Sequence, residues 1–494
     1  MIKTDKRKID YCQKIPLKDR AIKVECKLGG AEDTANILCV NARIAPVGVL
    51  VSDNSAKFTA KALFSVVMGG NSLSLCEGGV EFSADFNDER LKMGDKVIVN
   101  YTVERTTARI SNGVINAECY VLATAYALKN NSFEYLCGGE DLLLNNVEVT
   151  LPITLGCFKG NMATDGEEQV NRQLKNVVAS DCRAYVTGVD CNYGIITVTG
   201  YADISLIGLP KVEDSGIIYV EKKLPFSTEI DAPDVTNGDS AIAQVVVKTL
   251  KIDAIVDQDK NETTVTFSVT AQITATAYRN VIESLPEDCF STKNQLTITK
   301  GQMVCQKYNG CVTQNIRFSG EGVADQPLAE DCNIIATAYP RFTVTALECA
   351  NGQTVLSGVA EVGVFSRSQS GAYGYFNLSM PVEEKINGHV ENGKATVVIS
   401  NAYVSVKAGK LIFEGLLNVY IHGESECEMQ LITAVEIGEE KQINDSAISI
   451  YYLNAGCSLW QAVKQTGVCG EELFATVGDF PLQERKQVVV YRQR

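Results

Sequence analysis

The chain has 494 residues, with 45 Lys and Arg against 60 Asp and Glu, so its formal net charge is −15. This acidic balance argues against a nucleic-acid partner, because affinity for a phosphate backbone is built mostly from clustered Lys and Arg. A content of 45% apolar and 21% charged residues is typical of folded domains rather than of disordered or membrane-embedded chains. At roughly 150 residues per domain, the length predicts about three domains.

The N-terminal segment, residues 1–10, is charged and leads into no apolar stretch of a secretory signal. No run of the sequence has the length of a membrane-spanning helix. We therefore expect a protein without a transmembrane segment that stays in the compartment where it is made. Its 17 cysteines are odd in number and scattered, which favours buried reduced thiols over a secreted disulfide framework.

Short sequence landmarks recur three times along the chain, which indicates an internal repeat. The first landmark is Asn36–Cys39, which resembles Asn176–Ala179 and Asn333–Ala336. Two more follow in the same order at similar spacing: Lys57–Ala60, Thr197–Gly200 and Val355–Gly358, and then Ala125-Tyr126, Ala277-Tyr278 and Val419-Tyr420. The repeat predicts three related units, 1–150, 151–300 and 301–444, followed by a separate tail, 445–494.

The predicted units are rich in β-strands. Apolar and polar residues alternate strictly from Thr264 to Tyr278, and the same two-residue period runs through 115–125 and 411–421. Turn sequences such as Asn112-Gly113 separate these strands, so we predict antiparallel, sandwich-like β domains. Helix signals are sparse before residue 456, and Glu167 to Lys175 is the one short helix expected there.

The sequence offers few groups for catalysis. Of the two histidines, His389 follows Gly388 in a predicted turn and His422 falls on the polar side of the 411–421 strand, so we expect both to be exposed to solvent. There is no Cys-x-x-Cys pair and no phosphate-binding glycine loop, and the sequence predicts no catalytic, cofactor-binding or metal-binding residue. A glycosidase that pairs two distant carboxylates remains an alternative.

The tail differs from the rest of the chain in charge and in pattern. Residues 445–494 carry five basic and five acidic residues, so the units hold the whole net charge. Ile448–Leu453 is predicted as a strand, and Ser458 as the cap of a helix that contains Trp460. A second helix after Gly467 and a closing strand, 486–491, complete a small α+β domain with the order βααβ.

The tail resembles the LysM domain, a glycan-binding module of cell walls. The resemblance rests on Ile450-Tyr451-Tyr452 and on Gly456-Cys457-Ser458-Leu459-Trp460, although Cys457 stands where the family usually has Asp. It implies a groove that contacts a glycan or a protein and is formed by two loops: Ala455, Gly456, Cys457, Ser458 and Leu459, and Val477, Gly478, Asp479, Phe480 and Pro481. Alternatively, Trp460 is simply a core residue.

The units in turn resemble the SPOCS domain of SipL-type spore coat assembly proteins, which pair such β domains with a C-terminal LysM domain. Leu224-Pro225-Phe226 in the second unit carries the family signature, and Met380-Pro381-Val382 and Val80-Glu81-Phe82 are divergent counterparts in the third and first units. The resemblance implies a non-enzymatic mother-cell protein that attaches the coat at the forespore surface. Its implied partners are the coat's basement-layer ATPase and other coat proteins. A second hypothesis is a peptidoglycan or N-acetylglucosamine binder that acts through the tail.

Overall fold

The computed structural model describes residues 3–29, 36–69, 72–212, 216–327, 331–350, 353–441 and 448–491. Strands dominate this part of the chain, and its two helices are short and lie in the tail. The predicted mainly β class is therefore confirmed. None of the helices described is long and apolar enough to cross a membrane.

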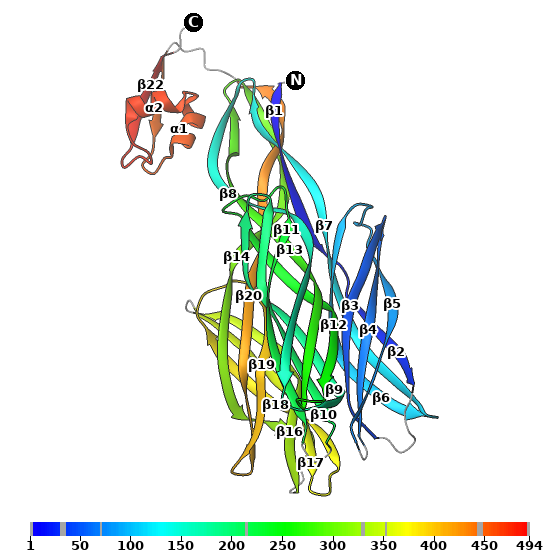
Figure 1. The fold of residues 1–494 in the computed structure, drawn as a ribbon. Coiled ribbons are helices and arrows are strands. Elements are labelled where there is room, and N and C mark those ends of the chain that lie inside the picture. Colours follow the sequence, from blue (N-terminus) through cyan, green and yellow to red (C-terminus); the bar gives the residue numbers. More distant parts are fainter. Residues whose placement is uncertain are drawn as a thin grey trace.

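The strands before the tail fall into three successive groups, which we call units one, two and three (Figure 1). Unit one contains β1 (Thr4–Pro16), β2 (Arg20–Gly29), β3 (Asn36–Ser52), β4 (Ser55–Gly69), β5 (Ser74–Asn87), β6 (Lys96–Ser111) and β7 (Val114–Gly139). Unit two contains β8 (Leu142–Val170), β9 (Leu174–Asn192), β10 (Ile195–Pro210), β11 (Ile218–Asp231), β12 (Ser240–Asp257) and β13 (Glu262–Ser291). Unit three contains β14 (Asn294–Glu321), β15 (Val323–Ala324), β16 (Cys332–Ala350), β17 (Gln353–Ser368), β18 (Tyr373–Ile386), β19 (Gly393–Lys407) and β20 (Lys410–Glu440).

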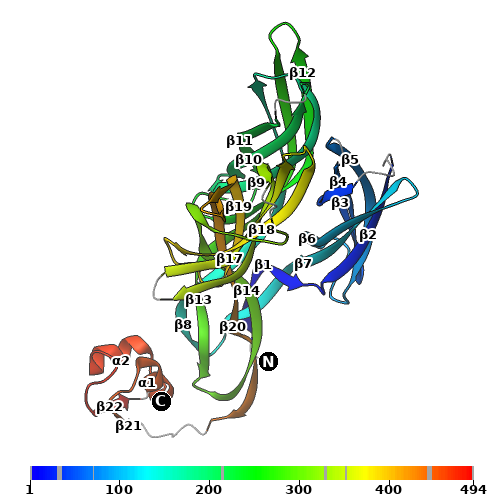
Figure 2. The same cartoon turned by 90° about the horizontal axis from the view of Figure 1, so that it is seen from below.

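Each unit pairs two antiparallel sheets. One sheet is a meander: β3-β4-β5, β9-β10-β11, or β16-β17-β18 with β15 at its edge. The other sheet is built on the long last strand of the unit, which is β7, β13 or β20. This strand pairs with the first strand of its unit and also with β6, β12 or β19. Apolar side chains of the two sheets form a separate core in each unit, as expected for a sandwich. Figure 2 shows the blue unit one set beside the green unit two and the yellow unit three.

The long strands continue beyond the sandwiches as three two-stranded ribbons, which we call the stalk (Figure 1). The stalk pairs residues 4–13 with 129–139, 142–153 with 279–291, and 294–308 with 424–440. Its ribbons share a core in which Leu136, Cys289 and Ile432 come from β7, β13 and β20 respectively. Successive units join at residues 140–141 and 292–293, so residues 150 and 300, the predicted unit boundaries, lie inside β8 and β14.

The sequence landmarks occupy the same register in each meander. Ala60, Gly200 and Gly358 lie on the middle strands opposite Phe82, Phe226 and Val382. At Gly200 a Cβ would lie 2.1 Å from the Tyr185 carbonyl oxygen and 2.5 Å from the Phe226 ring. The ring therefore packs directly on the backbone, which explains why a glycine faces the Pro-Phe signature here.

The prediction of a short helix from Glu167 to Lys175 is wrong. Residues up to Val170 belong to β8 and those from Leu174 belong to β9, and Val170 lies opposite Thr263 of β13. The segment is the end of a long antiparallel pair, so the hydrogen bonds of the sheet override the helical tendency of Glu and Gln.

The tail contains β21 (Ile448–Leu453), α1 (Leu459–Thr466), α2 (Gly470–Val477) and β22 (Lys486–Tyr491). Ser458 caps α1 in a reciprocal capping box with Gln461, and Gly467 ends the helix in the left-handed conformation. The two strands pair antiparallel, and the helices pack on one face of them around Leu453, Leu473 and Val488. The other face of the two strands is left without helices.

We expect the Phe267→Ala variant to lose about 3–5 kcal/mol of unfolding free energy, because Phe267 is 1% exposed in the core of unit two and its truncation leaves a cavity. Chemical denaturation of the full chain, followed by circular dichroism, measures the loss. The matched control is Ile282→Ala on the same strand, where the side chain is 72% exposed and the expected change is within about 0.5 kcal/mol. Equal effects of the two substitutions would contradict the assigned core.

Candidate functional site

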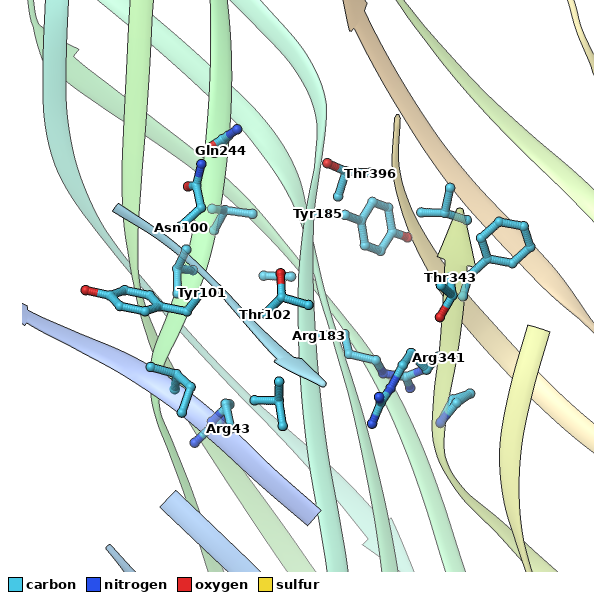
Figure 3. Close-up of a pocket in the computed structure, with 18 of the residues that line it drawn as sticks. Arg43, Asn100, Tyr101, Thr102, Arg183, Tyr185, Gln244, Arg341, Thr343 and Thr396 are labelled. Carbon is cyan, nitrogen blue, oxygen red and sulfur yellow. The ribbon is translucent and has the colours of Figure 1, made fainter. Parts of the chain in front are cut away.

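A cavity of about 950 Å³ lies where the three units meet, and we call it the central cavity (Figure 3). Its walls come from the first meander strand of each unit, β3, β9 and β16, and from β6, β12 and β19 of the second sheets. Polar side chains on the latter strands include Asn100, Gln244 and Thr396. All three units therefore contribute to one shared space.

Three arginines line the central cavity, one from each unit: Arg43, Arg183 and Arg341 (Figure 3). Their strand positions are equivalent, because each lies opposite the residue twenty positions later on the middle strand of its meander: Leu63, Asp203 and Glu361. Arg341 follows its Asn landmark by one residue more than the other two arginines do. A β-bulge between Ala338 and Arg341 absorbs the extra residue.

The three arginines differ in their partners. The Arg183 Nε lies 3.1 Å from the Asp181 carboxylate, and both side chains are mostly buried. Arg183 also donates a hydrogen bond to the carbonyl oxygen of Ile399, which joins units two and three. Among the described residues, no carboxylate lies within ion-pair distance of Arg43 or Arg341, although Glu104 and Glu361 also line the cavity.

A buried acid stands beside Arg183. Asp203 is 2% exposed and lies directly opposite Arg183 across the strand pair. Neither oxygen of its carboxylate has a hydrogen-bond partner in the described part of the chain. Burial raises the pKa of Asp203, and the nearby Ser400 hydroxyl and then the positive charges of Arg183 and Lys223 oppose that rise.

Next to the cavity, a second group of polar side chains joins the three units, and we call it the inter-unit cluster. Glu424 of unit three forms an ion pair with Lys14 of unit one and accepts a hydrogen bond from the hydroxyl of Tyr278 of unit two. The Lys14 ammonium lies 4.3 Å from the centre of the Tyr126 ring. Burial raises the pKa of Glu424, but the Lys14 charge and the two hydrogen bonds outweigh it and hold that pKa below 4.5.

The prediction that His422 is exposed is wrong. Its side chain is 5% exposed, because the polar side of β20 near residues 417–423 is covered by the neighbouring units rather than by water. Burial lowers the pKa of His422 to about 4, so the ring is neutral at pH 7. His389, by contrast, lies in the loop between β18 and β19, and its side chain is 44% exposed.

The structure brings the two predicted loops of the tail together. The Gly456 N–H donates to the Leu482 carbonyl at 2.7 Å, and the Leu482 N–H donates to the Cys457 carbonyl at 3.1 Å. Of the predicted groove residues, the exposed ones are Ala455, Gly456, Ser458, Asp479 and Pro481. Val477 is buried, Gly478 is half-buried, and Cys457, Leu459 and Phe480 pack partly against the tail core.

Trp460 fixes the tail to the stalk. Its indole N–H donates to the Asp288 carboxylate on β13 at 2.8 Å, and Lys464 forms an ion pair with the same carboxylate. Burial raises the pKa of Asp288, but these two donors outweigh it and lower that pKa. Trp460 also packs partly against the tail core, so it has both a core role and a contact role.

All 17 cysteines are free thiols, and eight of them are buried. Cys311, Cys349 and Cys469 are exposed. The prediction of buried thiols therefore holds for only part of the cysteines.

The sequence interpretation missed the arginines of the central cavity. Their signal is present in the repeat, because Arg43 and Arg183 each follow the Asn landmark of their unit by seven positions and Arg341 follows its own by eight. Comparing the polar positions of the three units, rather than only their apolar landmarks, finds this set.

We expect the Glu424→Gln variant to lose about 3 kcal/mol of unfolding free energy at pH 7, because it leaves the mostly buried Lys14 ammonium without its partner. A carboxylate with a lowered pKa stabilises the fold above its unfolded pKa, here near 4.5, and this contribution disappears as the pH falls through the folded pKa. The stability gap between wild type and variant should therefore shrink below about pH 4.5, as measured by urea denaturation across pH. A gap that is constant from pH 7 to pH 3 would contradict the role of the ion pair.

Comparison with known proteins gives no assignment for this chain. No protein-family model matches it, and neither a curated protein nor a solved structure is found to be similar. Its function is therefore inferred from its sequence patterns and from the geometry above.

Proposed function

We propose that the protein is a non-enzymatic adaptor of the bacterial spore envelope that helps attach or localise the coat at the forespore surface. The proposed location is the mother-cell cytoplasm at the forespore, and the proposed partners are the basement-layer ATPase of the coat and other coat proteins. The resemblance of the units and the tail to SPOCS and LysM domains supports this proposal. The single observation that carries it in the structure is an exposed apolar face on the tail.

That face lies on the side of β21 and β22 that the helices do not cover. Ile448 pairs with Tyr491 and Ile450 pairs with Val489 across the two strands, so their side chains are neighbours on one face. The exposed fractions are 53% for Ile448 and Ile450 and 75% for Tyr491. Contiguous exposed apolar groups on a small domain are typical of a protein-binding surface. A protein contact of the tail therefore has a physical basis.

We expect the double variant Ile450→Ser and Tyr491→Ser, made in the full chain, to reduce the amount of basement-layer ATPase that is captured in a pull-down at least about tenfold. The reason is that aromatic and aliphatic anchors, once buried against a partner, dominate such interfaces. Both side chains are exposed, so the fold should be preserved. The matched control is Ile255→Ser with Tyr403→Ser, which removes side chains of similar exposure from the units. Unchanged retention by the tail variant, or equal loss with the control, would argue against the tail as the docking surface.

A second candidate function is glycan binding by the tail, with peptidoglycan or N-acetylglucosamine oligomers as ligands. The observation in its favour is that hydrogen bonds join the two loops of the predicted groove, while Ser458, Asp479 and Pro481 on those loops are exposed. A carboxylate and a hydroxyl at such a groove can accept and donate hydrogen bonds to sugar hydroxyls.

If the tail binds glycan, calorimetric titration of the full chain with N-acetylglucosamine oligomers should give heat, and Asp479→Ala should weaken binding about tenfold, since a hydrogen bond to a charged group contributes roughly 1.5–3 kcal/mol. The control is Asp165→Ala, an exposed acid on β8. Absence of heat with the wild-type chain rejects glycan binding and leaves the adaptor proposal standing.

A further inference from the structure

The central cavity brings together one arginine from each of the three units. Arg43, Arg183 and Arg341 enter it from equivalent positions in three units, within a chain that has 15 more acidic than basic residues. Like charges that share a partly buried space repel one another unless an opposite charge is present. Such an opposite charge is supplied to Arg183 by Asp181.

Arg43 and Arg341 have free donor capacity. A guanidinium carries five N–H donors, and in the described part of the chain neither arginine forms a hydrogen bond or an ion pair. Glu104 and Glu361 line the same cavity and, together with Asp181, equal the three arginines in number, but neither glutamate pairs with Arg43 or Arg341 in the described part of the chain. The guanidinium groups of Arg43 and Arg341 therefore remain available to a ligand.

The donor set defines the chemistry of that ligand. The planar fork of a guanidinium matches the oxygens of a phosphate or a carboxylate in two parallel hydrogen bonds. The amides of Asn100 and Gln244 and the hydroxyl of Thr396 line the same cavity and can bind the remaining polar groups. A space of about 950 Å³ is at the upper end of the range for small-molecule sites.

From these observations we infer that the central cavity binds a small molecule that carries two or more phosphate or carboxylate groups, held between Arg43 and Arg341 with Arg183 completing the site. The arginines come from different units. A ligand can therefore place an anionic group at each of them only if it carries more than one such group. A monovalent anion is therefore bound much more weakly than a polyvalent anion.

The test is calorimetric titration of the full chain at low ionic strength with tripolyphosphate and, separately, with citrate. We expect at least one of the two to bind, with an affinity that falls as salt is added. Binding of tripolyphosphate alone assigns phosphate groups to the ligand, binding of citrate alone assigns carboxylates, and binding of both shows that the shared anionic chemistry suffices. No heat with either probe overturns the inference.

Three variants of the cavity arginines locate the binding. Arg43→Gln and Arg341→Gln should each lower the affinity for the probe at least about tenfold, because each removes charge-assisted hydrogen bonds. Arg43→Lys keeps the charge but loses the fork, so its loss should be smaller than that of Arg43→Gln. The control is Arg317→Gln, an exposed arginine on β14 that does not line the cavity and should leave affinity unchanged. Equal losses in the control and in the cavity variants overturn the inference, as does binding that neither cavity variant changes.

Discussion

The mostly buried contact of Glu424 with Lys14 and Tyr278 joins the three units at the base of the stalk. An ionised pair taken out of water is favourable only when its geometry is good and its remaining hydrogen-bonding groups are satisfied. Unit one supplies the ammonium, unit two the hydroxyl and unit three the carboxylate, so the contact forms only when all three units have the right relative positions. Asn100 and Gln244 line both the space around this cluster and the central cavity. The shape of the cavity therefore depends on the same alignment.

Repetition explains why the cavity is lined by equivalent residues. Alternation along a strand places one set of side chains in the core of a sandwich and the other set on its outer face. Arg43, Arg183 and Arg341 belong to the outer set, at the same register of three related meanders. When three units pack around a common space, an outer position of each unit becomes an inner position of the whole. A single charged residue in the repeat thus becomes a group of three.

The difference between the core side and the outer side of a strand also determines how much of the structure could be predicted from sequence. The alternation from Thr264 to Tyr278 correctly predicts a strand, and β13 contains it, because the two-residue period reports local backbone geometry. It also identifies which side of a strand faces the core of its own unit. It does not report what covers the other side, and His422 was therefore expected in water although units one and two enclose it. The strand at residues 167–170 was missed for a related reason, since its partner on β13 lies about a hundred residues away.

The tail and the central cavity occupy different parts of the molecule and depend on different contacts. The tail is fixed at the end of the stalk through Trp460 and Lys464, which both contact Asp288 (Figure 1). The cavity lies among the meanders of the three units, and a ligand that bridges the arginines stabilises the packing of those units by mass action. Such a ligand makes no contact with the face of β21 and β22 that the helices leave open. A partner on the tail and an anion in the cavity can therefore bind at the same time, and any coupling between them has to pass through the stalk, whose strands run from one region to the other.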